Sequence, residues 1–587
     1  MSVEATATAD PFLHQDLYTD LLTFAFCGST PYCQNQPLFI DAEDPSRFFN
    51  ATQFRRLVRT LIAGFKAHNV RQGDCVLLHL GNSILYPGLF FGIIGAGGVY
   101  MGSNPRSPQH ELDHIVGLAE PKLILTTRDA LETVQEVTTA RGISPEQIFI
   151  VDDRAVDHCA QLFLWSELGY SAGPDFFTNA GGNSGRHFNF VDILCYGENN
   201  WVLFTDPMAA QNTPAAMFST SGTGGLPKAA ILSHHAIVSH HRSIHYAVPY
   251  PVSRLMSLPM FHLFGALWTH LFPVRYGYPL FVLSRFETKQ FLAIVLRFQI
   301  SETYLVPAIV HTINRCTLPV SDYLASLRYV GVAGAPIDGA SIVQFRSRLH
   351  SLAYACQLWG MTEVGVAFQA RYGQHGDPGS IGTCLEGYEV RLVDQDRKIV
   401  QNDECAGELY VRGPGLLLAY KGRTDAKEAQ GWYRTGDVAF MKQGDYFIVG
   451  RTKELIKVRG WQVAPAEVEG VLLQHIGITD VAVIGVELKD GSGEVPRAYV
   501  VRSRDPSVTQ LTAEEVYNYA RQRLVSYKSL DGGVIFVEEI PRTASGKIQR
   551  FKLSQMNEYR EMVTSLVQRF ETGGTLEVGG KAMVSTN

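Results

Sequence analysis

Residues 219–228 read STSGTGGLPK, and this short stretch combines hydroxyl side chains, glycines and a single lysine. Glycine lets backbone N–H groups turn inward, serine and threonine hydroxyls add hydrogen-bond donors, and Lys228 adds a positive charge. These groups together predict a loop that binds a polyphosphate. The apolar residues 215–220 predict a strand before the loop, and Ser233 predicts the N-cap of a helix after it. We therefore expect a phosphate cradle made of a strand, this loop and a helix.

The loop differs from the Walker A motif of mononucleotide kinases and GTPases. In that motif the lysine follows a glycine, precedes serine or threonine, and opens the helix. Here Pro227 precedes Lys228 and Ala229 follows it. The spacing excludes that class, and the loop alone does not name the reaction.

Four later segments carry further chemical groups. They read LWGMTE at 358–363, YRTGD at 433–437, GRTKELIKVRGWQVAPAEVE at 450–469 and PRTASGKIQR at 541–550. Each alone predicts little, because a charged stretch is usually a solvated face. In this order, however, the set resembles the adenylate-forming superfamily of acyl-CoA synthetases, carrier-protein adenylation domains and luciferases. The resemblance runs from Pro37 to Leu553 and is nearest to the coumarate–CoA ligase branch and its fungal relatives.

The resemblance implies an ATP-dependent acid–thiol ligase. Such an enzyme joins a hydrophobic carboxylic acid to AMP with release of pyrophosphate, then transfers the acyl group to coenzyme A, with Mg²⁺ as its metal ion. The fungal relatives imply a role in secondary metabolism, on a fatty or polyketide acyl unit. Two alternatives stay open: loading of the phosphopantetheine on a separate carrier protein or polyketide synthase, and a non-catalytic nucleotide-binding relative. A luciferase-type oxygenase would use the same residues in its first step.

The resemblance also assigns catalytic roles to single residues. Lys547 is expected to bridge the attacking carboxylate and the α-phosphate, Thr362 to contact the α-phosphate, and Glu363 to bind Mg²⁺. His262 is expected between the acyl pocket and the thiol tunnel. Leu358 stands where ligases of the coumarate type usually have glycine, so it should fill part of the acyl pocket.

The nucleotide-binding residues that the resemblance implies come from several segments. Trp359 should stack on adenine, whereas Asp437 and Arg451 should bind the ribose. Gly224 stands where the family often has a second threonine, which removes one hydroxyl donor. The full set is Thr220, Ser221, Gly222, Thr223, Gly224, Gly225, Lys228, Gly334, Ala335, Pro336, Trp359, Gly360, Met361, Thr362, Asp437 and Arg451.

The second half-reaction implies a small domain that rotates between the two steps. Lys453 matches the hinge, and Lys457, Gly460 and Trp461 match the strand that lines the thiol tunnel. Gly450 stands where many relatives have a charged residue. Because glycine is permissive in φ and ψ, rotation should remain possible.

The elements that must position these groups follow from the apolar pattern. Short apolar runs, such as 75–80, 122–127 and 147–151, alternate with amphipathic segments and predict an α/β fold of mostly parallel sheets packed with helices. Beyond residue 450, apolar runs flank a helix with the capping box Thr512–Glu515, which predicts a smaller α+β unit. We expect an N-terminal adenylation domain at 1–449, a mobile C-terminal lid domain at 450–571 and a disordered tail at 572–587.

Composition narrows the class of protein further. Hydrophobic residues make up 46% and charged residues 18%, as in globular proteins, and the net charge of −6 argues against a broad nucleic-acid-binding surface. The nine cysteines form no C-x-x-C pair, which favours a reducing compartment over a zinc or disulfide framework. The N-terminus lacks signal-peptide features and the C-terminus lacks a peroxisomal tripeptide, so we expect a cytoplasmic protein. The segment Leu85–Met101 is short and rich in glycine, so it predicts a buried helix rather than a membrane span.

Overall fold

The computed structural model of the 587-residue chain describes most of its residues, in two compact units. The described residues are 20–27, 31–167, 188–204, 206–220, 227–374, 376–423, 425–488, 493–503, 511–543 and 546–557. The first unit holds the chain up to Val449 and the short stretch that ends at Gly546, and the second unit holds the rest from Gly450. The tail predicted at 572–587 lies outside the described residues.

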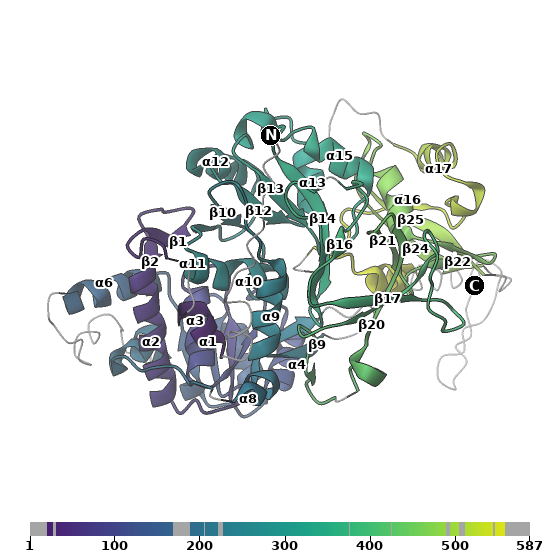
Figure 1. The fold of residues 1–587 in the computed structure, drawn as a ribbon. Helices are drawn as coiled ribbons and strands as arrows, with labels where there is room; N and C mark the ends of the chain where they lie inside the picture. Colours follow the sequence, from purple (N-terminus) through teal and green to yellow (C-terminus); the bar gives the residue numbers. More distant parts are fainter. Residues whose placement is uncertain are drawn as a thin grey trace, which may run out of the picture. The chain divides into compact units, whose positions relative to one another are not determined.

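The first unit contains a large sheet whose central strands run parallel (Figure 1). The strand order is β16-β15-β14-β13-β12-β10-β11-β1-β2. In chain order these strands are β1 (Pro37–Asp41), β2 (Phe48–Asn50), β10 (Arg254–Met256), β11 (Leu280–Val282), β12 (Glu302–Leu305), β13 (Tyr329–Val332), β14 (Tyr354–Met361), β15 (Gly365–Gln369) and β16 (Thr383–Cys384). Strands β10, β12, β13 and β14 are parallel neighbours, so their carboxyl ends meet at one edge of the sheet.

A second sheet of the first unit has the order β19-β9-β8-β4-β3-β5-β6-β7. Its strands are β3 (Cys75–His79), β4 (Val99–Gly102), β5 (Leu123–Thr126), β6 (Ile148–Ile150), β7 (Phe188–Asn189), β8 (Pro214–Thr220), β9 (Lys228–Ser233) and β19 (Ala419–Tyr420). The apolar runs at 75–80, 122–127 and 147–151 form adjacent parallel strands, as the sequence predicts.

The helices of the first unit pack against these sheets and bury their apolar residues (Figure 1). Helix α3 is buried along its whole length, which confirms the buried helix predicted within 85–101. Within the described residues, no helix has the length and apolar character needed to cross a membrane. The helices are α1 (Leu21–Cys27), α2 (Ala51–Ala67), α3 (Tyr86–Gly95), α4 (Gln109–Ala119), α5 (Leu131–Ala140), α6 (Ala155–Glu167), α7 (Phe190–Ile193), α8 (Pro207–Asn212), α9 (His234–Ile244), α10 (Leu263–Thr269), α11 (Leu271–Tyr276), α12 (Thr288–Phe298), α13 (Pro307–Asn314), α14 (Val320–Tyr323) and α15 (Gly339–Arg346).

A third, antiparallel sheet spans the end of the first unit. It has the order β17-β18-β20-β21, with β17 (Glu389–Val393), β18 (Gly407–Arg412), β20 (Tyr433–Lys442) and β21 (Asp445–Arg451). Strand β20 carries Asp437 with its side chain buried. This sheet therefore brings a carboxylate from the YRTGD segment into the interior.

The second unit is a smaller α+β structure. The hairpin β22 (Ile456–Val458) and β23 (Trp461–Val463) precedes a sheet of β24 (Ile478–Glu487), β25 (Glu494–Arg502) and β26 (Val534–Phe536), with helices α16 (Pro465–Leu472) and α17 (Ala513–Arg521). The predicted capping box is present, because Thr512 Oγ1 accepts from the Glu515 N–H at 3.2 Å and Glu515 Oε2 accepts from the Thr512 N–H at 2.8 Å. The two units together confirm the predicted α/β fold with a smaller C-terminal part.

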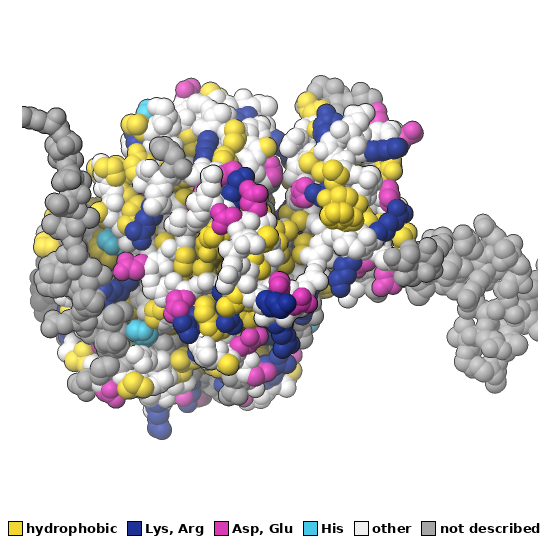
Figure 2. Space-filling view, turned by 45° about the vertical axis from the view of Figure 1, so that its right-hand side comes forward, with side chains coloured by type: hydrophobic (Ala, Val, Ile, Leu, Met, Phe, Trp, Pro, Cys, Tyr) yellow, Lys and Arg dark blue, Asp and Glu magenta, His cyan; other side chains and the backbone are white. Residues whose placement is uncertain are grey.

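Charged side chains of both signs mix on one face of the molecular surface. On the face shown in Figure 2, lysines and arginines lie among aspartates and glutamates rather than in one broad patch. A basic stripe of the kind that nucleic-acid-binding proteins present does not stand out on that face.

Candidate active site

The predicted phosphate loop joins two antiparallel strands. Thr220 ends β8 and is buried, Lys228 begins β9 and is exposed, and the two residues lie opposite each other in the β8–β9 pair. Residues 221–226, which include Ser221, Gly222, Thr223, Gly224 and Gly225, lie outside the described residues. The helix predicted after the loop begins only at His234, after β9, where Ser233 Oγ accepts from the Ala236 N–H at 3.1 Å.

The expected cradle of strand, loop and helix is therefore wrong in one respect. Ser233 caps α9 as predicted, but strand β9 separates the loop from that helix. The N-terminus of α9 is one full strand away from the loop and cannot supply its N–H groups to a phosphate there. Among the described residues, Lys228 brings a positive charge to the end of this loop.

The stretch 358–363 forms the end of β14 and the turn into β15. Trp359 and Met361 lie on β14, and Thr362 and Glu363 follow in the turn, both buried. A Cβ atom at Gly360 would lie 2.2 Å from the Gly365 carbonyl oxygen, so only glycine fits where the register of the hairpin shifts. Gly360 thus permits the close approach of β14 and β15 on either side of the turn that carries Thr362 and Glu363.

Trp359 and Asp437, predicted for adenine and ribose, contact each other directly. The indole Nε1–H donates to Asp437 Oδ2 at 2.9 Å, and both side chains are buried. The Trp359 ring also packs edge-on against Phe368, at 5.6 Å between centroids. A bond from a buried donor to a carboxylate is stronger than one between neutral groups, so it holds the ring and the carboxylate in one orientation.

Tyr420, which sequence reasoning missed, links the metal-binding candidate to the phosphate loop. Its hydroxyl donates to Glu363 Oε1 at 2.8 Å and lies 2.8 Å from the Tyr433 hydroxyl. The Lys228 ammonium stands 4.8 Å from the centroid of the Tyr420 ring. Burial raises the pKa of Tyr420 above its ordinary value, so at neutral pH the hydroxyl stays protonated and able to donate.

Backbone pairing explains how Tyr420 reaches this place. Strand β19 pairs with β9, and Tyr420 stands opposite Ala230, two residues after Lys228. The Leu417 N–H also donates to the Glu363 carbonyl at 2.8 Å. No local pattern around Tyr420 signals this role, because its partners are brought to it only by the sheet.

One buried carboxylate suits a magnesium ion held largely by phosphate oxygens. Mg²⁺ prefers hard oxygen ligands and is usually bound through one or two carboxylates plus substrate phosphates. Glu363 fits that pattern, because the Tyr420 hydroxyl holds its carboxylate and the Lys228 ammonium lies over the ring of the same tyrosine. Within the described residues, no three His, Cys, Asp or Glu side chains gather at one point, so a metal here would need ligands from the nucleotide.

The predicted acyl-pocket residues lie near the carboxyl ends of the parallel strands. His262 precedes α10 and follows β10, and Leu358 is buried on β14. A Cβ atom at Gly331 would lie 2.8 Å from Leu358 Cδ1 and 2.7 Å from Tyr304 Cδ1. Leu358 and Tyr304 therefore meet over Gly331 and fill that side of the sheet.

The segment Gly334, Ala335 and Pro336 leaves the carboxyl end of β13. Gly334 has φ of 96°, a left-handed conformation that glycine adopts without strain. The loop then reaches Asp338, whose Oδ1 accepts from the Ser341 N–H at 2.9 Å and caps α15. It thus stands at the same sheet edge as Trp359, in line with its predicted nucleotide contact.

The remaining predicted residues belong to the second unit. Lys457 and Trp461 lie on the two strands of the β22–β23 hairpin, whose turn is formed by Arg459 and Gly460 with φ of 47° and 87°. Such paired left-handed residues make a tight two-residue hairpin turn. Trp461 is 60% exposed and stacks on Tyr527 with 4.9 Å between ring centroids.

Lys547, Lys453 and Arg451 also lie in this unit or at its start. The Lys547 N–H donates to Thr543 Oγ1 at 3.1 Å, and its carbonyl accepts from the Thr543 N–H at 2.8 Å. Lys453 is exposed in the turn after β21, the strand that Arg451 ends. The roles assigned to these three residues toward nucleotide and thiol stay predictions.

Comparisons with known proteins cover nearly the whole chain. The model of the AMP-binding enzyme family matches residues 32–421, and that of the AMP-binding enzyme C-terminal domain matches residues 467–547. The first match includes the phosphate loop and Glu363, and the second includes Lys547.

Two fungal relatives and one solved structure are similar to this chain over almost their full length. The nicotinic acid-CoA ligase olcI of Penicillium canescens is 53% identical, over 93% of this chain and 99% of its own. The nicotinic acid-CoA ligase pyr1 of Aspergillus fumigatus is 49% identical, over 94% of this chain and 98% of its own. The crystal structure of the anthranilate CoA ligase AuaEII with anthranoyl-AMP has a TM-score of 0.77 at 22% identity, over 93% of this chain and 98% of that one, which supports the fold.

Proposed function

The chain belongs to the AMP-binding enzyme family and is an AMP-forming acyl-CoA ligase, and on this premise we propose that it activates an aromatic carboxylic acid in fungal secondary metabolism. The acid would first form an acyl-AMP with release of pyrophosphate, and its acyl group would then pass to the thiol of coenzyme A. The observation that carries the ATP-dependent first step is the group formed by Lys228, Tyr420 and Glu363 at the end of the phosphate loop.

This group suits the electrostatic demand of the first step. A carboxylate must approach the α-phosphate of ATP, and two anions repel each other unless positive charge and exact positioning are supplied. Lys228 supplies a positive charge, and Glu363 would hold Mg²⁺, which neutralises phosphate oxygens when bound. Thr362, in the same turn as Glu363, would donate to the α-phosphate. Lys547 would bridge the acid and the α-phosphate.

The nucleoside would lie at the edge formed by β13 and β14. Asp437, oriented by the Trp359 indole, would accept from the ribose hydroxyls, and Arg451 would assist. Trp359 and the segment 334–336 would contact adenine. The bond between indole and carboxylate supports this arrangement, because it holds both groups ready before the nucleotide arrives.

The proposed substrate class rests on the apolar wall and on the two named relatives. Leu358 and Tyr304 fill the sheet face beside the site, which favours a small acid with an apolar or aromatic body. The relatives olcI and pyr1 are named as ligases of nicotinic acid, an aromatic acid of one ring. Their names also favour coenzyme A over a carrier protein as the thiol partner.

Mass spectrometry of a one-pot reaction tests the proposal. The purified protein would meet ATP, Mg²⁺, coenzyme A and a panel of one- and two-ring aromatic, branched and fatty acids. We expect acyl-CoA from aromatic acids. Acyl-AMP without acyl-CoA would contradict coenzyme A as the acceptor and indicate a carrier protein. Neither product, together with no pyrophosphate exchange, would contradict catalysis by this chain.

The proposed role of Lys547 can be tested on the two half-reactions separately. Lys547→Ala should abolish acyl-AMP formation, yet leave thioester formation from supplied acyl-AMP close to wild type. Lys552→Ala, an exposed lysine five residues further on, is the matched control and should leave both steps intact. Loss of both half-reactions in a folded Lys547→Ala protein would refute the assignment.

A further inference from the structure

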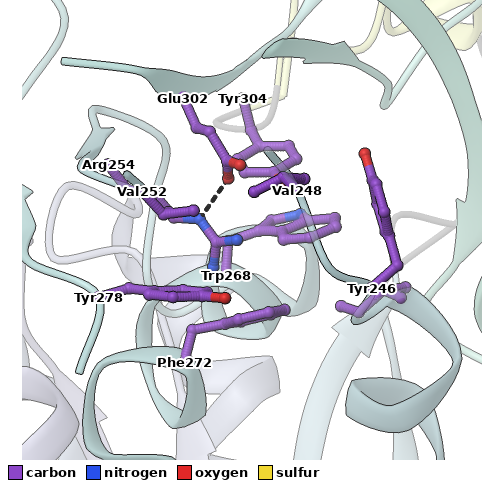
Figure 3. Close-up of a pocket in the computed structure, with 10 residues that line it drawn as sticks. Tyr246, Val248, Val252, Arg254, Trp268, Phe272, Tyr278, Glu302 and Tyr304 are labelled. Carbon is purple, nitrogen blue, oxygen red and sulfur yellow. Dashed lines mark hydrogen bonds and ion pairs between the residues drawn. The ribbon is translucent and has the colours of Figure 1, made fainter. Parts of the chain in front are cut away.

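A small pocket of the first unit holds a buried arginine among aromatic rings. Figure 3 shows the Arg254 guanidinium with Glu302 on one side and the rings of Phe272 and Tyr278 on the other. Arg254 and Glu302 begin the neighbouring strands β10 and β12 and stand opposite each other in register. Arg254 is only 5% exposed, so its charge is almost fully withdrawn from water.

The hydrogen bonds of Arg254 are incomplete within the protein. Its Nε donates to Glu302 Oε2 at 2.8 Å, and the guanidinium carbon lies 3.9 Å from the centroid of the Phe272 ring. Nη1 is buried and has no acceptor among the described residues. Guanidinium carries five N–H donors, and a buried donor without an acceptor is costly, so an acceptor from outside the protein would be favoured at Nη1.

Two aromatic residues that line this pocket stand beside the residues predicted for the acyl site. The Trp268 ring stacks on Tyr304 at 3.7 Å between centroids, and both residues line the pocket. Trp268 lies on α10, the helix that directly follows His262. Tyr304 meets Leu358 over Gly331 on the sheet face. The stacked pair of Trp268 and Tyr304 is therefore a wall that this pocket shares with the residues predicted to hold the acid.

We propose that Arg254 is a specificity-determining residue, which donates from Nη1 to a hydrogen-bond acceptor on the ring of the aromatic acid. This inference rests on the proposed function and names the substrate class more closely. The acid carries a ring nitrogen or a comparable neutral acceptor on the edge away from its carboxylate. Trp268 and Tyr304 contact the ring as aromatic walls.

The charge of the pocket explains why the acceptor is neutral. Glu302 already balances Arg254, and its second oxygen accepts from the Tyr250 hydroxyl at 3.0 Å. A second carboxylate on the substrate would leave a net negative charge buried among rings, which is strongly unfavourable. A ring nitrogen accepts the Nη1–H bond without adding charge. The pocket thus selects a heteroaromatic monocarboxylic acid over a dicarboxylic acid and over a plain arene.

Pairs of acids with the same shape test this inference. Nicotinate and benzoate form a one-ring pair, and quinoline-6-carboxylate and 2-naphthoate form a two-ring pair with the nitrogen on the far ring. We would measure kcat/KM for acyl-CoA formation with each acid. In at least one pair the wild-type enzyme should prefer the nitrogen-bearing acid about 10- to 100-fold, because a site with a buried charged donor discriminates against a ligand that leaves it unpaired.

The decisive variant removes the donor and its counter-charge together. Arg254→Met combined with Glu302→Gln avoids an unpaired buried glutamate and should reduce the preference to within about 2-fold, through loss of activity on the heteroaromatic acid alone. The single variant Arg254→Lys should keep part of the preference for the nitrogen-bearing acid, because the ammonium group can still donate a hydrogen bond. Arg275→Met is the matched control, since Arg275 is also buried and lies 3.8 Å from the centroid of a phenyl ring, that of Phe24. It should leave the preference unchanged.

Two results would overturn the assignment. One is a wild-type enzyme without preference in either pair, and the other is a folded double variant that keeps the wild-type ratio, as a purely structural ion pair would. If no acid yields a thioester, the failure is that of the proposed function. In that case calorimetry can measure the affinity of the same four acids for the wild type and for the double variant. The role of Arg254 then depends on whether the wild type binds the nitrogen-bearing acid of a pair more tightly and the double variant does not.

Discussion

Tyr420→Phe removes a single hydroxyl from the group that surrounds Glu363. The phenyl ring stays beneath Lys228, so the cation–ring contact at 4.8 Å is retained. What is lost is the 2.8 Å bond to Glu363 Oε1 and the contact with Tyr433. The change therefore isolates the orientation of the Glu363 carboxylate.

The expected loss follows from the strength of that bond. A hydrogen bond to a charged group contributes about 1.5–3 kcal/mol, and Tyr420 is only partly buried, so we take about 1.5–2 kcal/mol. Since 1.4 kcal/mol is a factor of ten, acyl-AMP formation should fall roughly 10- to 30-fold. The Mg²⁺ concentration for half-maximal rate should rise by a similar factor, whereas thioester formation from supplied acyl-AMP should not change.

Pyrophosphate exchange at several Mg²⁺ concentrations measures this effect. Tyr433→Phe is the matched control. Tyr420 gives its one hydroxyl proton to Glu363, so Tyr433 is the donor in the contact between the two tyrosines, and removing its hydroxyl leaves the Tyr420–Glu363 bond in place. We expect less than about a 3-fold effect from that change. An unchanged Mg²⁺ requirement in Tyr420→Phe, or an equal loss in Tyr433→Phe, would refute the reasoning.

Three further predictions concern other parts of the first unit. Trp359→Phe removes the 2.9 Å bond to the buried Asp437. The KM for ATP should therefore rise roughly 10-fold, and the free energy of unfolding should fall by about 1–3 kcal/mol. An unchanged KM for ATP would contradict the role of Asp437. Leu358→Ala should cost about 2–5 kcal/mol of stability by urea unfolding and shift kcat/KM toward bulkier acids, whereas an unchanged acid profile would remove Leu358 from the pocket wall. Burial lowers the pKa of His240 from 6.5 to about 4. Between pH 4 and 6.5 the imidazole is therefore protonated in the unfolded chain but neutral in the folded one. The contribution of His240 to the free energy of unfolding is complete above pH 6.5 and is lost as the pH falls toward 4. In His240→Gln the midpoint of urea unfolding should therefore change less steeply with pH between pH 4.5 and 6.5.

Local sequence signals predicted most elements but not the partners of the site. The capping box at Thr512 and the buried helix within 85–101 depend on neighbouring residues, and both are present. The sequence predicted the start of helix α9 at Ser233 but not strand β9, because the apolar residues 229–232 are too few to show a strand pattern of their own. The pairing of β9 with β8 is set by contacts across the loop, which no short window of sequence contains.

The same limit applies to the residues that surround the predicted site. Tyr420 bonds to Glu363 across 57 positions of the chain, and Arg254 pairs with Glu302 across 48. Each contact depends on which strands become neighbours, whereas Glu363, Asp437 and Lys547 could be named because they stand in recognisable segments. The family resemblance thus identified the residues expected to contact nucleotide, and the fold identified the side chains that hold them in place.

The exposed Trp461 gives the second unit an optical reporter. Among the tryptophans whose side chains the structure describes, Trp201, Trp268, Trp359 and Trp432 are buried, whereas Trp461 is 60% exposed and stacked on Tyr527. Its fluorescence should be shifted to longer wavelength than that of the buried indoles and should be readily quenched by iodide or acrylamide. A difference spectrum against Trp461→Phe would isolate this one signal. It would follow events at the β22–β23 hairpin in real time, without a label.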